Sequence, residues 1–401
     1  MAVKKALEKI RVLDFTRVLA GPFCTMLLAD MGAEVIKVEH PQGGDDSRAF
    51  GPFVEGESAY FMSINRNKKS MTLNLKKPRA VELIRKMIPS FDVVVENFRP
   101  GVMDKLGIGY EELKKINPRL VYASSSGFGY TGPYSQFPAY DLIVQGMGGV
   151  MSITGDSEDR PQKSGSSIGD IFAGVFCAVG ILGALEARHE TGKGQMVDVA
   201  MLDCQVAILE NAISRCLTTG TDPKPIGNRH SSITPFATFK TRDGFVNIAV
   251  GNDSLWEKFC GQIGEKKLLA DERFRTNALR TANRDDLEPL LAAAMEKDST
   301  TSWIDRLREV GVPCGPINKV SQVLQDPQVA AREMILEVDH PKAGRQKIPG
   351  CPIKMSETPC AVETASPLLG AHTESVLSEF LGLSAQEIQS LRKEGVLQAD
   401  W

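Results

Sequence analysis

Asp170 stands where a polar, glycine-containing stretch meets a long apolar one, and a carboxylate in that place can do chemistry. Residues 171–188 are predicted to form a helix that is apolar on every face. An aspartate at a helix start commonly caps the first turn. The same position favours the ionised carboxylate, which can attack an acyl donor where Gly165 and Gly169 leave room for one. Capping residue and covalent nucleophile are therefore both open roles, and they do not exclude each other.

A serine nucleophile is the competing interpretation of the same stretch. Gly165–Gly169 matches the G-x-S-x-G pattern of serine hydrolases, with Ser167 as its nucleophile. That pattern works when a buried strand runs directly into it. The preceding residues 159–164 are polar and include a proline, so we rank hydrolysis through Ser167 below chemistry at Asp170.

Phosphate-binding motifs are missing from the first strand–turn–helix unit. The turn from Phe15 to Pro22 contains no G-x-G-x-x-G, and the chain has no G-x-x-x-x-G-K-[ST]. Glu39, at the end of the second predicted strand, could hold a ribose, but the dinucleotide interpretation lacks its glycines. A basic run at 65–69 predicts either a solvated surface or a site for a phosphate-rich ligand.

Composition narrows the class of protein. The 401 residues are 42% hydrophobic and 24% charged, with a net charge of −3, which favours a globular protein of at least two domains without nucleic acid or membrane as a partner. Residues 1–15 lack the features of a signal peptide, and the apolar run 171–185 falls short of about 20 residues needed to span a bilayer. Eight scattered cysteines and five unclustered histidines predict free thiols, a cytoplasmic location and no metal site.

The spacing of apolar residues predicts an α/β fold in three segments. Residues 1–217 alternate strands and helices, the pattern of a Rossmann-like domain around a parallel sheet. A linker at 218–229 leads into a smaller α+β domain that ends near residue 330, and residues 331–401 return to the large domain. The expected strands are 10–15, 35–39, 92–96, 120–124, 195–199 and 244–250, and the expected helices lie near 78–87, 111–115, 141–151, 171–188, 254–263, 284–297, 301–310, 373–381 and 385–393.

Seven segments in order resemble one known family over essentially the whole chain. They are Val12–Phe15 with Ala20–Pro22, Gly32–Glu39, Val95–Gly101, Ser126–Gly129, Gly169–Asp170, Gly192–Gln195 and Gly311–Pro316. These segments resemble the class III CoA-transferases, the CaiB/BaiF family of formyl-CoA transferase and carnitine CoA-transferase, with succinyl-CoA-dependent members as the nearest. The resemblance implies two ring-like chains interlocked as a homodimer, or a heterodimer with a homologous subunit.

The resemblance also implies roles for individual residues. Asp170 would be the catalytic nucleophile, and coenzyme A would be a substrate, without a permanently bound cofactor. The implied CoA contacts are Leu19, Ala20, His40, Leu73, Asn74, Leu75, Lys76, Asn97, Phe98, Arg99, Lys105, Ala139 and Tyr140.

Two departures from the family pattern bear on substrate and reaction. Formyl-CoA transferase has a glycine run over its active site, whereas this chain has Arg229 and His230 in the corresponding loop 227–232. An arginine can hold a carboxylate by two parallel hydrogen bonds, so these two residues are candidate substrate contacts, and a dicarboxylic donor is favoured over formyl or oxalyl groups. Acyl-CoA racemases of the same fold use a histidine where this chain has Tyr140, and tyrosine, with a pKa near 10, is a poor base at neutral pH.

The predicted activity is therefore transfer of CoA from an acyl-CoA, preferably succinyl-CoA, to a dicarboxylic or aryl-substituted succinic acid. Asp170 would pass through an aspartyl anhydride and an aspartyl-CoA thioester. Acyl-CoA racemase and thioester hydrolase through Ser167 are the alternatives.

Overall fold

The computed structural model describes residues 4–398, which form two compact units. Of these residues, the first unit takes 4–150, 163–214 and 328–398, and the second takes 151–162 and 215–327. The boundaries near 214 and 327 lie three residues from those expected at 217 and 330. Residues 151–162 belong to the second unit by contact, although no change of composition marks a break there.

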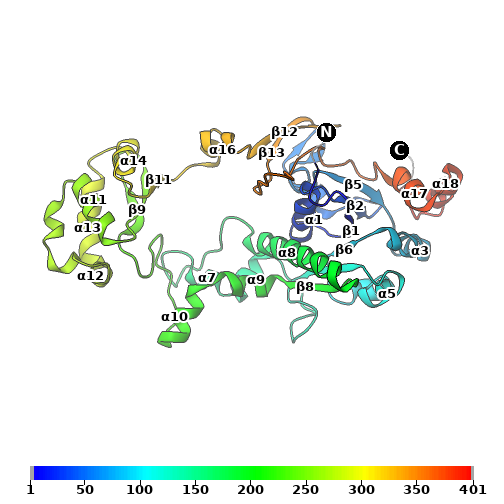
Figure 1. The fold of residues 1–401 in the computed structure, drawn as a ribbon, viewed down its shortest axis with the longest axis horizontal. Coiled ribbons are helices and arrows are strands. Elements are labelled where there is room, and N and C mark those ends of the chain that lie inside the picture. Colours follow the sequence, from blue (N-terminus) through cyan, green and yellow to red (C-terminus); the bar gives the residue numbers. More distant parts are fainter. Residues whose placement is uncertain (1–3, 399–401) are drawn as a thin grey trace. The chain divides into compact units, whose positions relative to one another are not determined.

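The core of the first unit is a parallel sheet of six strands (Figure 1). Its strands are β1 (Arg11–Asp14), β2 (Glu34–Glu39), β5 (Lys68–Thr72), β6 (Val93–Glu96), β7 (Val121–Ser126) and β8 (Met196–Ala200). Val12 and Leu13 of β1 and Val93–Val95 of β6 have no exposed surface, as expected of strands covered on both faces. The prediction of an α/β fold around a parallel sheet is confirmed.

The strand order is β5-β2-β1-β6-β7-β8. Successive strands are added on one side of β1 as far as β5, and then on its other side from β6 onward. The order therefore reverses between β1 and β6. In doubly wound sheets, ligands bind outside the carboxyl ends of the strands at such a reversal point, so the residues after β1 and β6 are where a site is expected.

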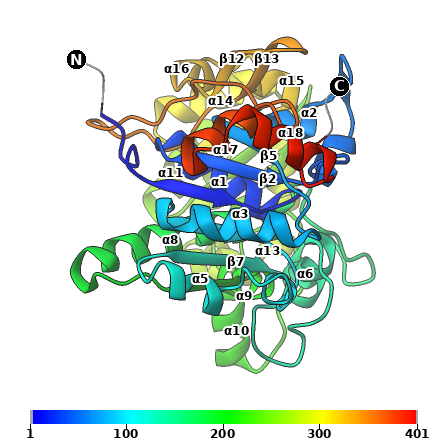
Figure 2. The ribbon, with the colours of Figure 1, turned by 90° about the vertical axis from the view of Figure 1, so that its right-hand side faces the viewer.

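Helices cover both faces of the sheet (Figure 2). One face packs against α3 (Pro78–Met87), α5 (Tyr110–Ile116) and the C-terminal helices α17 (Thr373–Leu381) and α18 (Ala385–Lys393). The other face packs against α1 (Ala20–Asp30) and α8 (Ile168–Thr191). The C-terminal helices thus complete a core that begins near the start of the chain.

Helix α8 is the long apolar helix that contains Asp170 in its first turn. It has 24 residues, and its mean hydropathy of 2.1 over 18 residues makes it long and apolar enough to cross a bilayer by length and composition. The prediction that this run is too short is therefore wrong. A single such helix is weak evidence for a membrane span, because α8 lies on α1, β7 and β8. At Gly174 an added Cβ would lie 2.6 Å from the carbonyl oxygen of Ala20, so this glycine permits the close approach of α8 to α1.

The basic run at 65–69, which leads into strand β5, is more buried than the sequence predicts. Arg66 is buried and binds the carboxylate of Asp30, with Nη2 2.6 Å from Oδ2. Lys68 is buried 3.3 Å from Asp14. Neither side chain belongs to a solvated surface or an open phosphate site, so both interpretations of the run fail for these two residues.

The remaining elements of the first unit are short. They are β3 (Phe53–Val54), β4 (Glu57–Ser58), α2 (Ala59–Ile64), α4 (Val102–Lys105), α6 (Asp141–Met147), α9 (Met201–Ile208), the hairpin β12 (Ile335–His340) and β13 (Gly344–Pro349), and the 3-10 helices η1 (Asp46–Ala49) and η2 (Ile88–Ser90). Helices α7 (Val150–Ile153), α10 (Asn211–Thr219) and α16 (Pro327–Ala331) cross the sequence boundaries between the units.

The second unit is built on a three-stranded antiparallel sheet in the order β11-β10-β9. Its strands are β9 (Phe236–Lys240), β10 (Phe245–Ala249) and β11 (Cys314–Pro316), and its helices are α11 (Asp253–Gln262), α12 (Asn277–Ala282), α13 (Arg284–Met295), α14 (Thr300–Glu309), α15 (Val320–Val323), η3 (Lys266–Leu269) and η4 (Glu272–Phe274). Trp256, Phe259 and Trp303 lie in one apolar core with residues of α13. This unit therefore has a core of its own.

Candidate active site

A cavity of about 390 Å³, which we call the aspartate pocket, opens at the carboxyl ends of β1, β6 and β7. Asp170 lies in its wall. The lining comes mainly from the segments that follow these strands, as the reversal of strand order predicts. The residues are Arg17, Val18, Leu19, Ala20, Asp46, Asn97, Phe98, Arg99, Pro100, Val102, Ser125, Ser126, Gly127, Ser135, Phe137, Pro138, Ala139, Tyr140, Asp170 and Met201.

Asp170 is the third residue of α8, within its first turn, and Ser167 occupies the N-cap position. Of the two roles that the sequence left open for Asp170, that of capping residue is therefore excluded, because the helix begins at Ile168 and not at Ile171. Burial, and to a lesser degree the negative charge of Asp141, raise the pKa of Asp170 to about 7. Within residues 4–398, no cation opposes that shift. The carboxylate is thus a partly buried acid beside a cavity, without a cationic partner in the described part of the chain.

Asp141 positions the backbone just before the nucleophile candidate. It is the first residue of α6 and is 8% exposed. Its Oδ1 accepts a hydrogen bond from the Gly169 amide at 2.8 Å, and its Oδ2 accepts one from Gln145 Nε2 at 2.8 Å. Sequence reasoning missed this role, although an aspartate at the start of a predicted helix was a signal that could have been used.

The turn after β1 is held by buried charges. The Nζ of Lys37 lies 2.8 Å from Asp45 Oδ2 and donates to the carbonyl oxygen of Thr16 at 2.7 Å. The Oδ1 of Asp45 accepts from the Val18 amide at 3.0 Å. Val18 has φ of +66°, a left-handed conformation that a β-branched residue rarely adopts. Tertiary contacts therefore impose the shape of the segment that supplies Arg17, Val18, Leu19 and Ala20 to the pocket.

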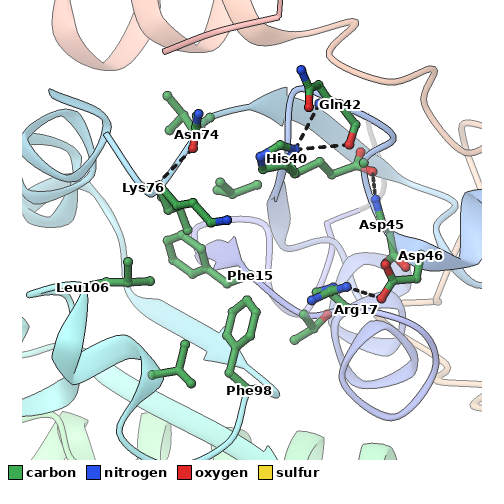
Figure 3. A pocket seen from close by; sticks show the side chains of 17 residues that line it. Phe15, Arg17, His40, Gln42, Asp45, Asp46, Asn74, Lys76, Phe98 and Leu106 are labelled. Carbon is green, nitrogen blue, oxygen red and sulfur yellow. Dashed lines mark hydrogen bonds and ion pairs between the residues drawn. The ribbon is translucent and has the colours of Figure 1, made fainter. Parts of the chain in front are cut away.

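A second cavity, the strand-end pocket, encloses about 460 Å³ along the carboxyl ends of β1, β2 and β5 (Figure 3). Figure 3 shows His40 and Gln42 on one side, Asn74 and Lys76 on the other, and the rings of Phe15 and Phe98 below them. The lining is Phe15, Thr16, Arg17, Val38, Glu39, His40, Gln42, Gly44, Asp45, Asp46, Leu73, Asn74, Leu75, Lys76, Phe98, Val102 and Leu106.

The structure gathers nearly all predicted CoA contacts at these two cavities. Leu19, Ala20, Asn97, Arg99, Ala139 and Tyr140 line the aspartate pocket, and His40, Leu73, Asn74, Leu75 and Lys76 line the strand-end pocket, with Phe98 in both. Lys105 ends α4, is exposed and lines neither cavity. These assignments stay predictions, because the structure establishes only the shared location.

Arg229 and His230 belong to the second unit, where both have partners. The Nε of Arg229 donates to both carboxylate oxygens of Glu288, at 3.0 and 2.8 Å, and its Nη2 lies 2.7 Å from Oε2. His230 packs its ring on Phe236, with ring centroids 5.3 Å apart. A substrate carboxylate would have to compete with Glu288 for Arg229, which the sequence did not indicate.

Neither the alternative nucleophile nor the alternative base gains support from the geometry. Residues 161–164, before the G-x-S-x-G pattern, run as irregular chain, whereas the serine hydrolase pattern needs a strand there. Tyr140 does line the aspartate pocket with Asp170, but its side chain is 74% exposed. Among the described residues that line this pocket there is no histidine.

The fold and the site together define a doubly wound α/β enzyme with a carboxylate at the reversal point of its sheet. The chain belongs to CoA-transferase family III, whose pattern matches residues 7–373. It is 40% identical over 395 residues to succinyl-CoA:glutarate CoA-transferase of Mus musculus, covering 98% of this chain and 91% of that protein. It is 46% identical over 354 residues to acetyl-CoA:oxalate CoA-transferase of Acetobacter aceti, covering 88% and 90%.

Known structures agree with this assignment. The crystal structure of a CaiB/BaiF family protein from Brucella suis has a TM-score of 0.84 at 40% identity, covering 94% of this chain and 100% of that one. The resemblance to the CaiB/BaiF family is thereby confirmed, and the protein is a CoA-transferase.

Proposed function

We propose that this enzyme moves CoA from succinyl-CoA to a dicarboxylic acid, with the carboxylate of Asp170 as nucleophile. The observation that carries the proposal is that Asp170 is a partly buried carboxylate with a pKa of about 7 in the wall of a cavity, and that no described cation pairs with it. Such a group is ionised in about half of the molecules at neutral pH, and it gains stability when it becomes neutral. Forming an ester-like bond to an acyl group gives it that neutrality.

The proposed steps exchange one thioester for another. An Asp170 oxygen attacks the thioester carbon of the donor, the carbon–sulfur bond breaks, and an aspartyl anhydride and CoA thiolate form. The thiolate attacks the side-chain carbonyl of Asp170, which gives an aspartyl-CoA thioester and releases succinate. The acceptor carboxylate attacks that thioester, which forms a second anhydride and releases the thiolate. The thiolate then attacks the acceptor carbonyl of this anhydride, which forms the new CoA ester and frees the Asp170 carboxylate. The net reaction consumes no water and no oxidant, and it needs no nucleotide hydrolysis.

Coenzyme A in this scheme is a substrate, with no permanently bound cofactor. Its nucleotide would lie in the strand-end pocket, near His40 and Lys76, and its thiol end would lie in the aspartate pocket. The geometry supports this arrangement because the two cavities share lining residues and run along neighbouring strand ends.

The choice of acids rests on the relatives. Glutarate and oxalate, the acids named for the mouse and Acetobacter relatives, are both aliphatic dicarboxylic acids. We therefore favour an aliphatic dicarboxylic acid over an aryl-substituted succinic acid as acceptor. The donor named for the mouse relative supports succinyl-CoA, whereas the acetyl-CoA:oxalate relative weakens the inference that Arg229 and His230 disfavour oxalyl groups.

A dimer of two interlocked chains is part of the proposal. Apolar side chains on α6, α8 and α9 are exposed in the single chain: Leu142, Ile143, Met147, Phe176, Val179 and Val206 are each 39–59% exposed. Exposed apolar groups on neighbouring helices of one unit favour coverage by another chain, either a second copy or a homologous subunit. Light scattering should give twice the chain mass, and Val179→Asp should lower it.

A cytoplasmic location completes the proposal. All eight cysteines are free thiols, and those at 24, 177, 204, 260 and 351 are buried. Free thiols are typical of reducing compartments.

The test is a matrix of donors and acceptors. Purified enzyme is mixed with succinyl-CoA, acetyl-CoA or butyryl-CoA and with glutarate, oxalate or phenylsuccinate, and new CoA esters are detected by mass spectrometry. Glutaryl-CoA formed from succinyl-CoA at the highest kcat/KM supports the proposal. Free CoA without a new ester would indicate a hydrolase, and exchange of the α-hydrogen of a branched acyl-CoA without transfer would indicate a racemase.

A further inference from the structure

The two cavities share four lining residues, and we call the place where the cavities adjoin the passage. Arg17, Asp46, Phe98 and Val102 belong to the aspartate pocket and to the strand-end pocket. Phe98 and Val102 make part of this passage apolar. Among the described residues, Arg17 and Asp46 are the charged side chains that the two linings share. A molecule that occupies both cavities must pass beside them.

Arg17 and Asp46 form an ion pair at this passage (Figure 3). The Nη2 of Arg17 donates to Oδ2 of Asp46, and the side chains are 45% and 49% exposed. Ion pairs with this much solvent access contribute little to the stability of a protein. The pair can therefore be broken at small cost if a better partner for the guanidinium arrives.

The backbone of Arg17 is fixed even though its side chain is exposed. The Arg17 amide donates to Asn97 Oδ1 at 2.8 Å, and Asn97 Nδ2 donates to the Arg17 carbonyl oxygen at 2.8 Å. The next amide, that of Val18, is held by Asp45 at 3.0 Å. The guanidinium can therefore change partner by side-chain rotation alone, from an anchored base at the junction of the cavities.

We propose that Arg17 is an exchangeable cation: Asp46 holds it in the free enzyme, and the diphosphate of a CoA ester takes it over on binding. This inference rests on the proposed function. Guanidinium groups bind phosphate oxygens through a fork of parallel hydrogen bonds, and a diphosphate carries more charge than one carboxylate. Asp46 thus competes with the ligand, and it also keeps the passage neutral when no ligand is bound.

The experiment measures CoA dissociation constants by calorimetry for wild type, Arg17→Ala, Asp46→Asn and the double variant. Arg17→Ala should weaken binding about tenfold, the loss expected for hydrogen bonds to a charged group. Asp46→Asn should tighten binding about two- to fivefold, because the competitor is gone. The double variant should bind like Arg17→Ala, since Asp46 matters only through Arg17.

Glu82→Gln is the matched control. Glu82 pairs with Arg79 at 2.9 Å on the exposed side of α3, and neither residue lines the aspartate pocket or the strand-end pocket. The substitution removes one negative charge from an exposed arginine pair, as Asp46→Asn does, and it should leave CoA binding unchanged.

Three results would overturn the proposal while CoA still binds the wild type. They are unchanged or weaker binding by Asp46→Asn, unchanged binding by Arg17→Ala, and a gain from Asp46→Asn that persists without Arg17. The last would mean simple repulsion between Asp46 and the ligand. A wild-type enzyme that does not bind CoA would instead overturn the proposed function, and the role of Arg17 with it.

Discussion

The carboxylates of Asp14 and Asp45, near the turn after β1, are buried, and the carboxylate of Asp170, at the start of α8, is partly buried. The charges around them are opposite. Burial alone would raise the pKa of Asp14 and Asp45. Lys68 and Lys37 instead hold the pKa of Asp14 below its usual value, and Lys37 does the same for Asp45. Asp170 has no such cation among the described residues, so burial and the charge of Asp141 raise its pKa to about 7. Asp14 and Asp45 are thus fixed as anions that shape the turn, whereas Asp170 remains able to react.

Glu96 shows that a raised pKa by itself does not identify the nucleophile. Burial raises the pKa of Glu96 to about 7 as well. Its Oε2, however, accepts from the Phe98 amide at 2.7 Å, its Oε1 accepts from Tyr130 at 3.1 Å, and it is 1% exposed. It lines neither the aspartate pocket nor the strand-end pocket. Access to a ligand, together with the lack of a neighbouring cation in the described chain, is what separates Asp170 from the buried acids.

Removing the Asp170 carboxylate should have the largest effect on activity. Asp170→Ala and Asp170→Asn should lower transfer by at least about a thousandfold, because no other group can form the anhydride. Circular dichroism should show an intact fold. Ser167→Ala, at the N-cap of the same helix, is the control and should keep most of the activity. Loss of activity in Ser167→Ala with retention in Asp170→Ala would reverse the assignment.

Removing a buried lysine near the turn after β1 should instead affect stability. Lys37 is fully buried between Asp45 and Thr16, so Lys37→Met leaves Asp45 buried without its partner and should cost about 3–5 kcal/mol. Hydrogen exchange of β1 and β2 amides in increasing urea checks this in the first unit. Lys114→Met, which breaks the exposed pair with Glu111, should cost less than about 1 kcal/mol. Equal losses of stability in Lys37→Met and Lys114→Met would contradict the distinction between buried and exposed ion pairs.

Neutralising Asp141 should shift the pH dependence of the reaction. Asp170 must be ionised to attack, so kcat/KM should rise with pH to a plateau above about 7. Asp141→Asn removes the charge that helps to raise the pKa of Asp170 while keeping an oxygen for the Gly169 amide. The rising limb should therefore move to lower pH, by about one unit or less. An unmoved limb would mean that Asp141 acts through geometry alone.

The smallest effect is expected in the second unit. If Arg229 leaves Glu288 for the far carboxylate of the donor, Arg229→Ala should raise KM for succinyl-CoA severalfold, with little change in kcat. Butyryl-CoA, which lacks that carboxylate, should be unaffected. The measurement is the ratio of kcat/KM for the two donors. An unchanged ratio would mean that Glu288 is the lasting partner of Arg229 and that the pair has a structural role.

Much of the fold could be predicted because periodic apolar segments were the strongest signal in the sequence. The strands at 92–96 and 120–124 and the helix at 78–87 match β6, β7 and α3 to within a residue at most ends. Most predicted CoA contacts meet at the cavities, since the segments that carry them come directly after parallel strands. Strand order alone therefore brings these residues together, without any need to know the long-range contacts of their side chains.

Features that depend on distant ion pairs could not be predicted in this way. β5 begins Lys68-Lys69-Ser70, which has no apolar alternation, and Lys68 is buried because it pairs with Asp14. Arg66, just before β5, is buried because it pairs with Asp30. The pairing of Arg229 with Glu288 spans 59 residues. The three-residue error at the start of α8 arose because Ile168 and Gly169 were assigned to the preceding loop.

The most direct test of the central claim is to find the aspartyl-CoA thioester on the protein. The enzyme is incubated with succinyl-CoA without an acceptor, quenched in acid and digested, and the peptide that contains Asp170 is weighed by mass spectrometry. We expect this peptide to gain the mass of CoA less one water, glutarate to remove the addition, and Asp170→Asn to abolish it. A CoA adduct on another residue, or turnover with no adduct under any quenching condition, would contradict the assignment of Asp170 as the nucleophile.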